Sequence, residues 1–360
     1  MGTRTILKGS VALRAAAIAG ALALPTGVSA EQITLKSSDG TVNLVGEFVA
    51  FEDNTYVIRT GLGELRLSAA RVSCEGAACP TFETAEADVS IAGSDTVGLG
   101  LMPLLLEGYA AHLGAEETLT ATEVDGEIIA NLVADDGFGD ELGSYLVTSS
   151  VSSDAFTTLL DGSANIGMAS RRIRPSEARQ LIEAGAGNMI SPENEHIIAV
   201  DSLVVITHPS NPIEQLDIAD LRGIYSGQIT NWSQVGGPNA PITIVERQDG
   251  SGTRSVFTNI VFEGDDADLL GSAIVATDNT TVASTVNSDP NAIGYVGYAF
   301  QRGAKPISLV NECGITMTPD AFSARTEEYS LQRRLYLYNR DASLTGDSRQ
   351  FVEYVKSQDA

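Results

Sequence analysis

The chain has 360 residues, of which 43% are hydrophobic and 19% are charged, and its formal net charge at pH 7 is -25. This length is sufficient for two domains with their own cores, and the composition is that of a globular protein rather than a disordered chain. The excess of acidic residues excludes non-specific binding to nucleic acids and docking on anionic lipid, because both need a basic surface.

The first 30 residues have the pattern of an export signal. Basic residues precede a short apolar run, residues 15–24, and Val28-Ser29-Ala30 supplies the small-x-small pattern of a cleavage site. A buried N-terminal helix is the alternative, but the order of charge, apolar run and cleavage site favours export. The apolar run is too short to span a bilayer. We therefore expect cleavage after about Ala30 and a mature protein outside the cytoplasm.

Residues 31–80 are expected to form a small all-β module. Short runs alternate apolar and polar positions, and Ser-Asp-Gly, Glu-Asp-Asn and Gly-Leu-Gly separate them with typical turn chemistry. Residues 80–87 then have the composition of a linker. The module is either a structural appendage or a docking site for a partner, and the sequence leaves both open.

The chain has three cysteines. Cys74 and Cys79 are close enough in sequence to close a small disulfide loop in an oxidising compartment. A zinc site is the alternative, but one cysteine pair without nearby histidines supports it weakly. Cys313 has no evident partner, and we expect a buried thiol there. With only three histidines in the chain, a metal site built from several histidines is not expected.

From residue 88 onward, β-rich runs alternate with helical patterns. DVSIAG precedes VGLGLMPLLLEGYAAHLG, NIGMAS precedes PSEARQLIEAG, and PITIVERQ precedes TRSVFTNIVFEG. This alternation is typical of an α/β fold in which crossover helices connect the strands. Sheets of this kind bind ligands outside the carboxyl ends of their strands, where helix N-termini point inward.

Three strand-to-helix junctions in this region carry polar side chains suited to an anion. The first, IAGSDTVGLG, offers the hydroxyls of Ser94 and Thr96 beside the free N–H groups of a helix start. The second, NIGMASRRIRPSE, ends its strand at Ser170. The third is ERQDGSGTRSVF, residues 246–257. If the junctions meet at one edge of a sheet, they form a single polar site.

The third junction places helix-start chemistry around a glycine-rich turn. A helix start leaves unpaired N–H donors and about half a positive charge, and glycines let a ligand approach the backbone closely. Ser251 and Thr253 add hydroxyl donors, and Arg247 or Arg254 can bond two oxygens of one tetrahedral anion. Together these donors can replace the water that a buried anion loses.

Each of these features alone has a plainer explanation. Gly-Ser-Gly-Thr is commonly a turn followed by a helix cap, and the arginines at positions 171, 172 and 174 commonly form a salt-bridged cluster. The turn is not a Walker A loop, because no Gly-Lys-Ser/Thr ends it, and it is not the Gly-x-Ser-x-Gly elbow of hydrolases. Three such junctions in one α/β chain nevertheless favour an oxyanion site.

Six separated segments follow one another along the chain: IAGSDTV, GSANIGMASRRIRPSE, DSLVVITHPSNP, LRGIYSGQITNWSQVGG, ERQDGSGTRSVF and NAIGYVGYAF. They occur in the order found in the phosphate-binding receptors of bacterial phosphate ABC importers, which the chain therefore resembles over about residues 88–355. The resemblance implies an α/β, two-lobed periplasmic binding protein type II fold, preceded here by the small all-β module. The implied phosphate-binding-like domain covers residues 88–360, with lobe I at about 88–200 and 298–355 and lobe II at about 201–297.

The same resemblance implies a non-enzymatic receptor in the periplasm. Such a receptor captures inorganic phosphate between its lobes and delivers it to the membrane permease of an ABC importer. It acts as a monomer, with no cofactor, no metal, no catalytic residue and no nucleic-acid partner. Trp232 and Tyr295, in two of the shared segments, are expected to be packing residues rather than ligand contacts.

The resemblance also implies which residues hold the ligand. They are Ser94, Asp95, Thr96, Ser170, Arg247, Asp249, Ser251, Gly252 and Thr253. Within this set, Asp249 is expected to orient Arg247.

One position departs from the family pattern. Typical members have an aspartate shortly after the IGxxS-type strand, which accepts the proton of phosphate and rejects sulfate. Here the stretch reads Met168-Ala169-Ser170-Arg171 and contains no carboxylate. Either Asp95 or Asp249 supplies that acceptor, or the discrimination against sulfate is weaker.

Three other functions remain open from the sequence. The first is a receptor for another tetrahedral oxyanion, such as sulfate, molybdate or arsenate. The second is a secreted phosphatase, although no nucleophile–base pair or metal-ligand set is legible in the chain. The third is an envelope adhesion or scaffold protein built around the module at residues 31–80.

Overall fold

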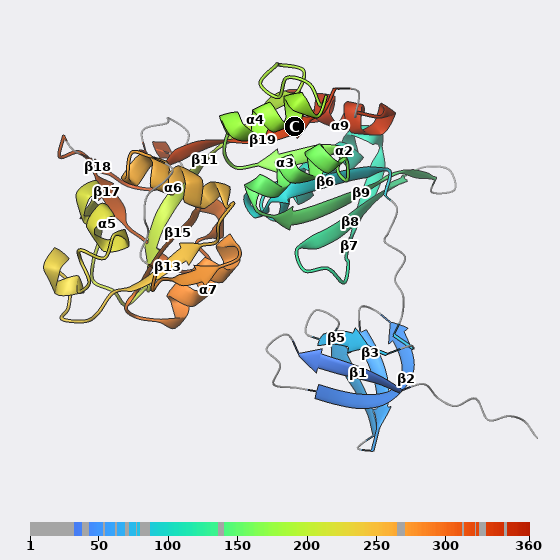
Figure 1. The fold of residues 1–360 in the computed structure, drawn as a ribbon, viewed down its shortest axis with the longest axis horizontal. Helices are drawn as coiled ribbons and strands as arrows, with labels where there is room; N and C mark the ends of the chain where they lie inside the picture. The colour runs from blue at the N-terminus through green and yellow to red at the C-terminus, as the bar shows by residue number, and fades with distance from the viewer. Residues whose placement is uncertain are drawn as a thin grey trace, which may run out of the picture. The chain divides into compact units, whose positions relative to one another are not determined.

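The computed structural model describes residues 32–37, 43–52, 55–61, 63–68, 72–76, 78–79, 87–135, 140–264, 271–311, 313–320, 322–323, 329–341 and 344–360 (Figure 1). The chain divides into two compact units, Met1–Pro80 and Thr81–Ala360. The expected export signal lies outside the described residues, and so do residues 80–86 of the expected linker. Among the described residues, none of the helices has the length and hydropathy of a membrane span.

The described part of the first unit is a five-stranded antiparallel sheet with the strand order β4-β3-β2-β1-β5. Ile33 and Leu35 on one strand and Tyr56 and Ile58 on another form its buried core, because alternate side chains of a strand point to the same face. The prediction of a small all-β module is confirmed. Its strands are β1 (Gln32–Ser37), β2 (Asn43–Glu52), β3 (Thr55–Thr60), β4 (Gly63–Ser68) and β5 (Val72–Glu75).

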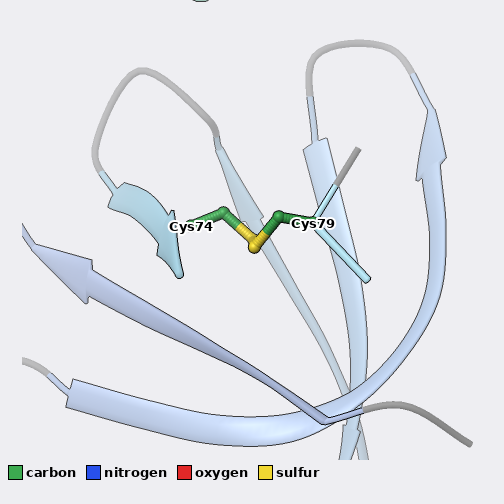
Figure 2. The surroundings of a disulfide bond; sticks show 2 residues. All are labelled: Cys74 and Cys79. Atoms are coloured by element: carbon green, nitrogen blue, oxygen red, sulfur yellow. A yellow bond between two sulfur atoms is a disulfide. The ribbon is translucent and has the colours of Figure 1, made fainter. Parts of the chain in front are cut away.

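A disulfide bond joins β5 to the residues that follow it. Cys74 and Cys79 are covalently linked, with 5.9 Å between their Cα atoms (Figure 2). The predicted pairing is confirmed. Because both sulfur atoms are used in the bond, this pair has no thiolate left to bind zinc.

Strands and helices alternate along the second unit and form two lobes (Figure 1). The large sheet runs through both lobes, with the strand order β14-β13-β15-β11-β19-β10-β6-β9-β8-β7. The first lobe, cyan and green in Figure 1 with the red helix α9, contains β6 (Val89–Ser94), α1 (Asp95–Gly98), α2 (Met102–Leu113), β7 (Ala115–Ala121), β8 (Glu127–Ala134), β9 (Glu141–Ser150), α3 (Ser152–Asp161), β10 (Ile166–Ala169), α4 (Pro175–Glu183) and α9 (Gly346–Val355).

The second lobe is mainly yellow and orange in Figure 1. It contains β12 (Gln215–Asp217), α5 (Ile218–Tyr225), η2 (Trp232–Val235), β13 (Thr243–Arg247), α6 (Gly252–Val261), β14 (Ile274–Ala276), α7 (Asn279–Ser288), β15 (Ala292–Gly297), η3 (Tyr298–Phe300), β16 (Lys305–Pro306), β17 (Ser308–Val310) and β18 (Thr316–Met317). Strands β12, β17 and β18 form a separate small sheet.

Helices cover both faces of the large sheet in each lobe. In the second lobe, Leu203 and Val205 pack into the core that contains Phe257 of α6, whereas Val204 and Ile206 pack into the core that contains α7. Successive residues of a strand point to opposite faces, so an unbroken apolar run is buried on both sides. This packing explains why the strand stretch SLVVIT contains so many apolar residues, and it confirms the predicted α/β architecture.

Two long strands, β11 (Glu195–Thr207) and β19 (Gln332–Asn339), connect the lobes (Figure 1). Strand β11 pairs with β19 from Glu195 to Ser202 and with β15 from Leu203 to Thr207. Its first part therefore belongs to the sheet of the first lobe and its last part to the sheet of the second lobe. Bending at these strands is the natural way for the lobes to move relative to each other.

The boundary between the lobes differs from the expected one. Ile307, Leu309 and Leu331 belong to the core of the second lobe, because β17 pairs with β12. The chain therefore returns to the first lobe at β19 and not at residue 298. The expectation of packing roles is met, since Trp232 and Tyr295 are completely buried in the same core.

Cys313 lies at the surface, in the turn between β17 and β18. Its backbone N–H donates a hydrogen bond to Asn311 Oδ1 at 3.0 Å. The expectation of a buried thiol is wrong, because this turn holds the side chain away from the core.

Replacing both Cys74 and Cys79 with serine is expected to destabilise the first unit by about 2 kcal/mol, because the bond restricts the unfolded chain. Calorimetry of the full chain is predicted to show one transition for each unit, and only the transition of Met1–Pro80 moves to lower temperature. The variant Cys313→Ser is the matched control and shifts neither transition. A shift of the larger transition in the double variant would contradict the independence of the two units.

Candidate functional site

The three strand-to-helix junctions singled out in the sequence meet between the two lobes. Strand β6 leads into α1 at Ser94, β10 ends just before Ser170, and β13 ends at Arg247 before α6 begins. Gly93 permits the first turn, since its φ is +133° and an added Cβ would lie 2.2 Å from the carbonyl oxygen of Met168. The expected polar site is therefore assembled from elements far apart in sequence.

Serine hydroxyls form the part of the site that the first lobe contributes. Ser94 Oγ donates to Ser170 Oγ at 2.9 Å, and Ser152 Oγ lies 3.2 Å from the same atom. The backbone N–H of Ser170 donates to Ser152 Oγ at 3.0 Å. All three side chains are buried. Ser152 was not predicted, and the available signal was a serine at the start of a helix that follows a strand.

Arg247 is the most unusual side chain of the site. It is completely buried, and its Nη2 donates to Asp95 Oδ1 at 3.0 Å and to the carbonyl oxygen of Thr277 at 3.2 Å. Its Nε and Nη1 have no hydrogen-bond partner among the described residues. Burying donors of a cation without partners is costly. Because these two nitrogens lie on different edges of the guanidinium group, an anion beside Arg247 can accept a charge-assisted hydrogen bond from one of them.

Asp95 belongs to the first lobe, but its partners come from the second. Besides Arg247, it accepts hydrogen bonds from the backbone N–H and from Nδ2 of Asn279, at 2.9 and 2.7 Å. Asn279 begins α7, and both side chains are buried. The buried carboxylate therefore joins the two lobes and fixes the position of the guanidinium group. Asn279 was not predicted from the sequence.

The expectation that Asp249 orients Arg247 is wrong. The side chain of Asp249 is 97% exposed and pairs with Arg254 instead. The physical reason is its place in the turn beyond the end of β13, where the side chain points to solvent. Asp95 takes the role that was expected of Asp249.

The N-terminus of α6 completes the second lobe's side of the site. Ser251 caps the helix, with its Oγ accepting a hydrogen bond from the backbone N–H of Arg254. Gly252 packs directly on the serines of the first lobe, since an added Cβ would lie 2.2 Å from Ser152 Oγ. Thr253 Oγ1 lies 3.4 Å from Thr96 Oγ1. The lobes are therefore in contact through the residues expected to hold the ligand.

A second buried arginine, Arg333 on β19, reaches the same place. Its Nη1 donates to Thr253 Oγ1 at 2.7 Å and its Nη2 to Thr96 Oγ1 at 3.2 Å. Its Nε donates to Asp201 Oδ2 at 2.8 Å. Sequence reasoning missed this residue. The available signal was an arginine two positions before Leu335, at an inward-facing position of an apolar strand.

Arg171 and Arg172, which follow Ser170, do not point into this cluster. Arg171 pairs with Glu177 at 2.6 Å, and Arg172 pairs with Glu195 at 2.7 Å. The plainer explanation of these arginines, a salt-bridged cluster, is correct for both.

Two acidic side chains next to the site, Glu246 and Asp278, have shifted pKa values. Burial raises the pKa of Glu246, although the Tyr295 hydroxyl and the backbone N–H of Arg247 both donate to its carboxylate. For Asp278, burial acts in the opposite direction from hydrogen bonds donated by Thr281, and the bonds prevail and lower its pKa. The carboxylate of Glu246 is thus easier to protonate than that of Asp278, which lies at the start of α7.

A model of the PBP superfamily domain matches residues 80–357, which is most of the chain. The chain belongs to the PBP superfamily. The predicted two-lobed periplasmic binding protein fold is thereby confirmed for the second unit. The small β-sheet of the first unit lies before the matched residues.

Curated relatives within this superfamily include two phosphate-binding proteins PstS. The one from Bacillus subtilis is 28% identical over 165 residues, 46% of this chain and 53% of the relative. The one from Borreliella burgdorferi is 28% identical over 185 residues, 50% of this chain and 63% of the relative. The chain thus spans between about half and two thirds of the length of these relatives.

Solved structures show the same PBP architecture. A putative phosphate ABC transporter substrate-binding protein with bound phosphate from Clostridium perfringens has a TM-score of 0.58 and 27% identity, covering 75% of this chain and 93% of that one. An ABC-type phosphate transport receptor from Vibrio cholerae has a TM-score of 0.53 and 24% identity, covering 75% and 94%. The second likeness supports the fold alone.

Gly252→Ala is expected to hold the lobes of this PBP-superfamily protein apart. The added Cβ would lie 2.2 Å from Ser152 Oγ and 2.4 Å from Ser170 Oγ, both of which are buried. Overpacking of this kind destabilises the closed arrangement by about 1 to 3 kcal/mol. Small-angle X-ray scattering should show a larger radius of gyration than for the unmodified chain.

The control for this variant is Gly264→Ala in the same lobe, where an added Cβ meets nothing within 4 Å. It is expected to leave the scattering curve unchanged. Identical curves for Gly252→Ala and the unmodified chain would show that the lobes do not approach as closely in solution.

Proposed function

We propose that this protein is an extracytoplasmic receptor that binds inorganic phosphate between its two lobes and delivers it to the membrane permease of an ABC importer. The observation that carries the proposal is the state of Arg247. This completely buried cation keeps two guanidinium nitrogens without a partner among the described residues, next to a cluster of hydroxyls. A tetrahedral oxyanion is the chemical group that such an arrangement fits best.

The donors of the site come from both lobes. Ser94, Thr96 and Ser170 belong to the first lobe, whereas Arg247 and Thr253 belong to the second. An anion bonded to all of them interacts more strongly with the closed arrangement than with an open one. Only such differential binding shifts the equilibrium between the two states. Closure on the anion is therefore a consequence of where the donors lie.

The relatives support phosphate as the ligand. The curated proteins that the chain matches are named phosphate-binding proteins, and the structure from Clostridium perfringens contains bound phosphate. These names also support transport through an ABC importer as the role. Export by the predicted signal at residues 1–30 and a location in the periplasm are consistent with that role, as is a monomer without a nucleic-acid partner.

Binding rather than catalysis is part of this proposal. Ser251 is engaged as a helix cap, with Arg254 N–H as its donor. The histidines have their contacts elsewhere: His112 lies against Tyr354, His196 bonds Asn339 and His208 bonds Ser210. A serine nucleophile needs a neighbouring base. Steady release of phosphate from a generic ester, lost on Ser251→Ala, would instead support a phosphatase.

Arg247→Met is expected to weaken phosphate binding at least about tenfold, since one hydrogen bond to a charged group is worth about 1.5 kcal/mol or more. Isothermal titration calorimetry measures the affinity directly. The loss also removes the protection against heat that phosphate is predicted to give the unmodified chain.

Two further variants make this experiment interpretable. Arg222→Met removes an arginine of α5 that pairs with Glu263 at the surface of the same lobe, and it should leave phosphate binding unchanged. Asp95→Asn combined with Arg247→Met removes both members of the buried pair, so that no unpaired charge destabilises the fold. Undiminished phosphate affinity in a folded Arg247→Met protein would rule out the proposed site.

A further inference from the structure

Arg333 is placed to control how two central hydroxyls can bond. It extends from β19, one of the strands that connect the lobes, and only 1% of its side chain is exposed. It bonds Thr96 of the first lobe and Thr253 of the second, while Asp201 of the neighbouring strand holds its Nε. Asp201 is its register partner on β11, so the strand pairing itself fixes the guanidinium group.

The hydrogen bonds that Thr96 accepts leave its hydroxyl able only to donate. Asn279 Nδ2 donates to Thr96 Oγ1 at 3.0 Å, and Arg333 Nη2 donates to it at 3.2 Å. A threonine hydroxyl has two acceptor lone pairs and one hydrogen, and a guanidinium group has no acceptor. Both lone pairs of Thr96 are therefore occupied. Its hydroxyl can only donate its hydrogen to a further partner.

The same reasoning applies to Thr253. Arg333 Nη1 donates to Thr253 Oγ1 at 2.7 Å. The oxygen of Thr96 lies 3.4 Å away, and since Thr96 can only donate, Thr253 is the acceptor of that contact. With both lone pairs engaged, the hydrogen of Thr253 is also available only for donation. In this arrangement the hydrogen of Thr96 is directed to Thr253, so the pair offers an anion the hydrogen of Thr253 and no acceptor.

The nearby carboxylates, Asp95 and Asp249, add few free hydrogen-bond acceptors to the site. Asp95 already accepts three hydrogen bonds, of the roughly four that an ionised carboxylate can accept. Asp249 is 97% exposed and engaged with Arg254. An anion next to these threonines therefore meets mainly donors: the Thr253 hydroxyl, the helix start at α6 and an open nitrogen of Arg247.

We infer that Arg333 is a positioning residue that makes Thr96 and Thr253 obligate hydrogen donors, so that the site selects the fully deprotonated oxygens of a tetrahedral dianion. This inference rests on the proposed function and specifies the form of the ligand. Hydrogenphosphate presents three unprotonated oxygens, sulfate presents four, and dihydrogenphosphate presents only two. The site consequently prefers hydrogenphosphate to dihydrogenphosphate and accepts sulfate as well.

The first experiment is a calorimetric titration of the unmodified chain with phosphate and with sulfate, at several pH values on both sides of the second ionisation of phosphate. Phosphate affinity should fall about tenfold from the basic to the acidic end, the size expected when one hydrogen bond to a charged group is lost. Sulfate affinity should change less than about twofold, since sulfate keeps the same charge and all its acceptors throughout.

The sulfate titration also serves as the control for protein groups that titrate. The charged groups around Arg333 and the anion position are Asp95, Asp201, Arg247, Glu246 and Asp278. A change in any of them alters the binding of both anions. Only the difference between phosphate and sulfate reports the protonation of the ligand.

Variants at Arg333 then test its role. Arg333→Gln frees a lone pair on each threonine to accept a ligand proton. The ratio of phosphate to sulfate affinity should then change with pH only about threefold instead of about tenfold. Arg333→Lys, which retains a donor-only cation, should keep the pH dependence of the unmodified chain. Arg334→Gln, an exposed arginine next in the sequence, is the matched control and should change neither affinity nor ratio.

Asp201→Asn combined with Arg333→Gln avoids leaving Asp201 unpaired and replaces the single variant if that protein does not fold. No binding of either anion by the unmodified chain would reject the proposed function itself. Phosphate binding with no pH dependence beyond that of sulfate would overturn this inference alone. So would an Arg333→Gln protein that keeps the full pH dependence.

Discussion

The lobes depend on a buried ion pair between Arg247 and Asp95. The two side chains are 0% and 4% exposed, so each charge would be very unfavourable without the other. Asp95 lies on the first lobe and Arg247 on the second, and the pair therefore exists only while the lobes are together. Asn279 strengthens the contact with two further donors to the carboxylate. Closure thus completes the site and, at the same time, aims the remaining nitrogens of the guanidinium group.

This arrangement explains how a chain with a net charge of -25 can build the proposed site for an anion. The cations that matter, Arg247 and Arg333, are buried and held by Asp95 and Asp201 rather than spread over the surface. Repulsion from the acidic exterior is screened beyond about 8 Å at physiological salt. Short hydrogen bonds in a dry environment then decide the affinity, while the exterior charge mainly slows the encounter.

Local sequence patterns predicted much of this protein, whereas the features that depend on pairing between distant strands could not be predicted. The alternation of strands and helices was sufficient for the α/β architecture, the resemblance to phosphate-binding receptors supplied the two lobes, and helix-start chemistry pointed to Arg247 and Thr253. Spacing alone could not show which carboxylate reaches Arg247, and Asp249, two residues away, was the wrong choice because its turn faces solvent. Asn279 and Arg333 escaped prediction because their place depends on how β11, β15 and β19 pair across the sheet. The return to the first lobe was misplaced for the same reason, since it depends on β17 pairing with a strand far away in sequence.

The most direct test of the central claim is a crystal structure determined with phosphate present. The predicted result is one anion between the lobes, within hydrogen-bond distance of Arg247 Nε or Nη1 and of the Thr253 hydroxyl, with the Arg247–Asp95 pair intact. An anion bound elsewhere, with both of those arginine nitrogens still unbonded, would contradict it.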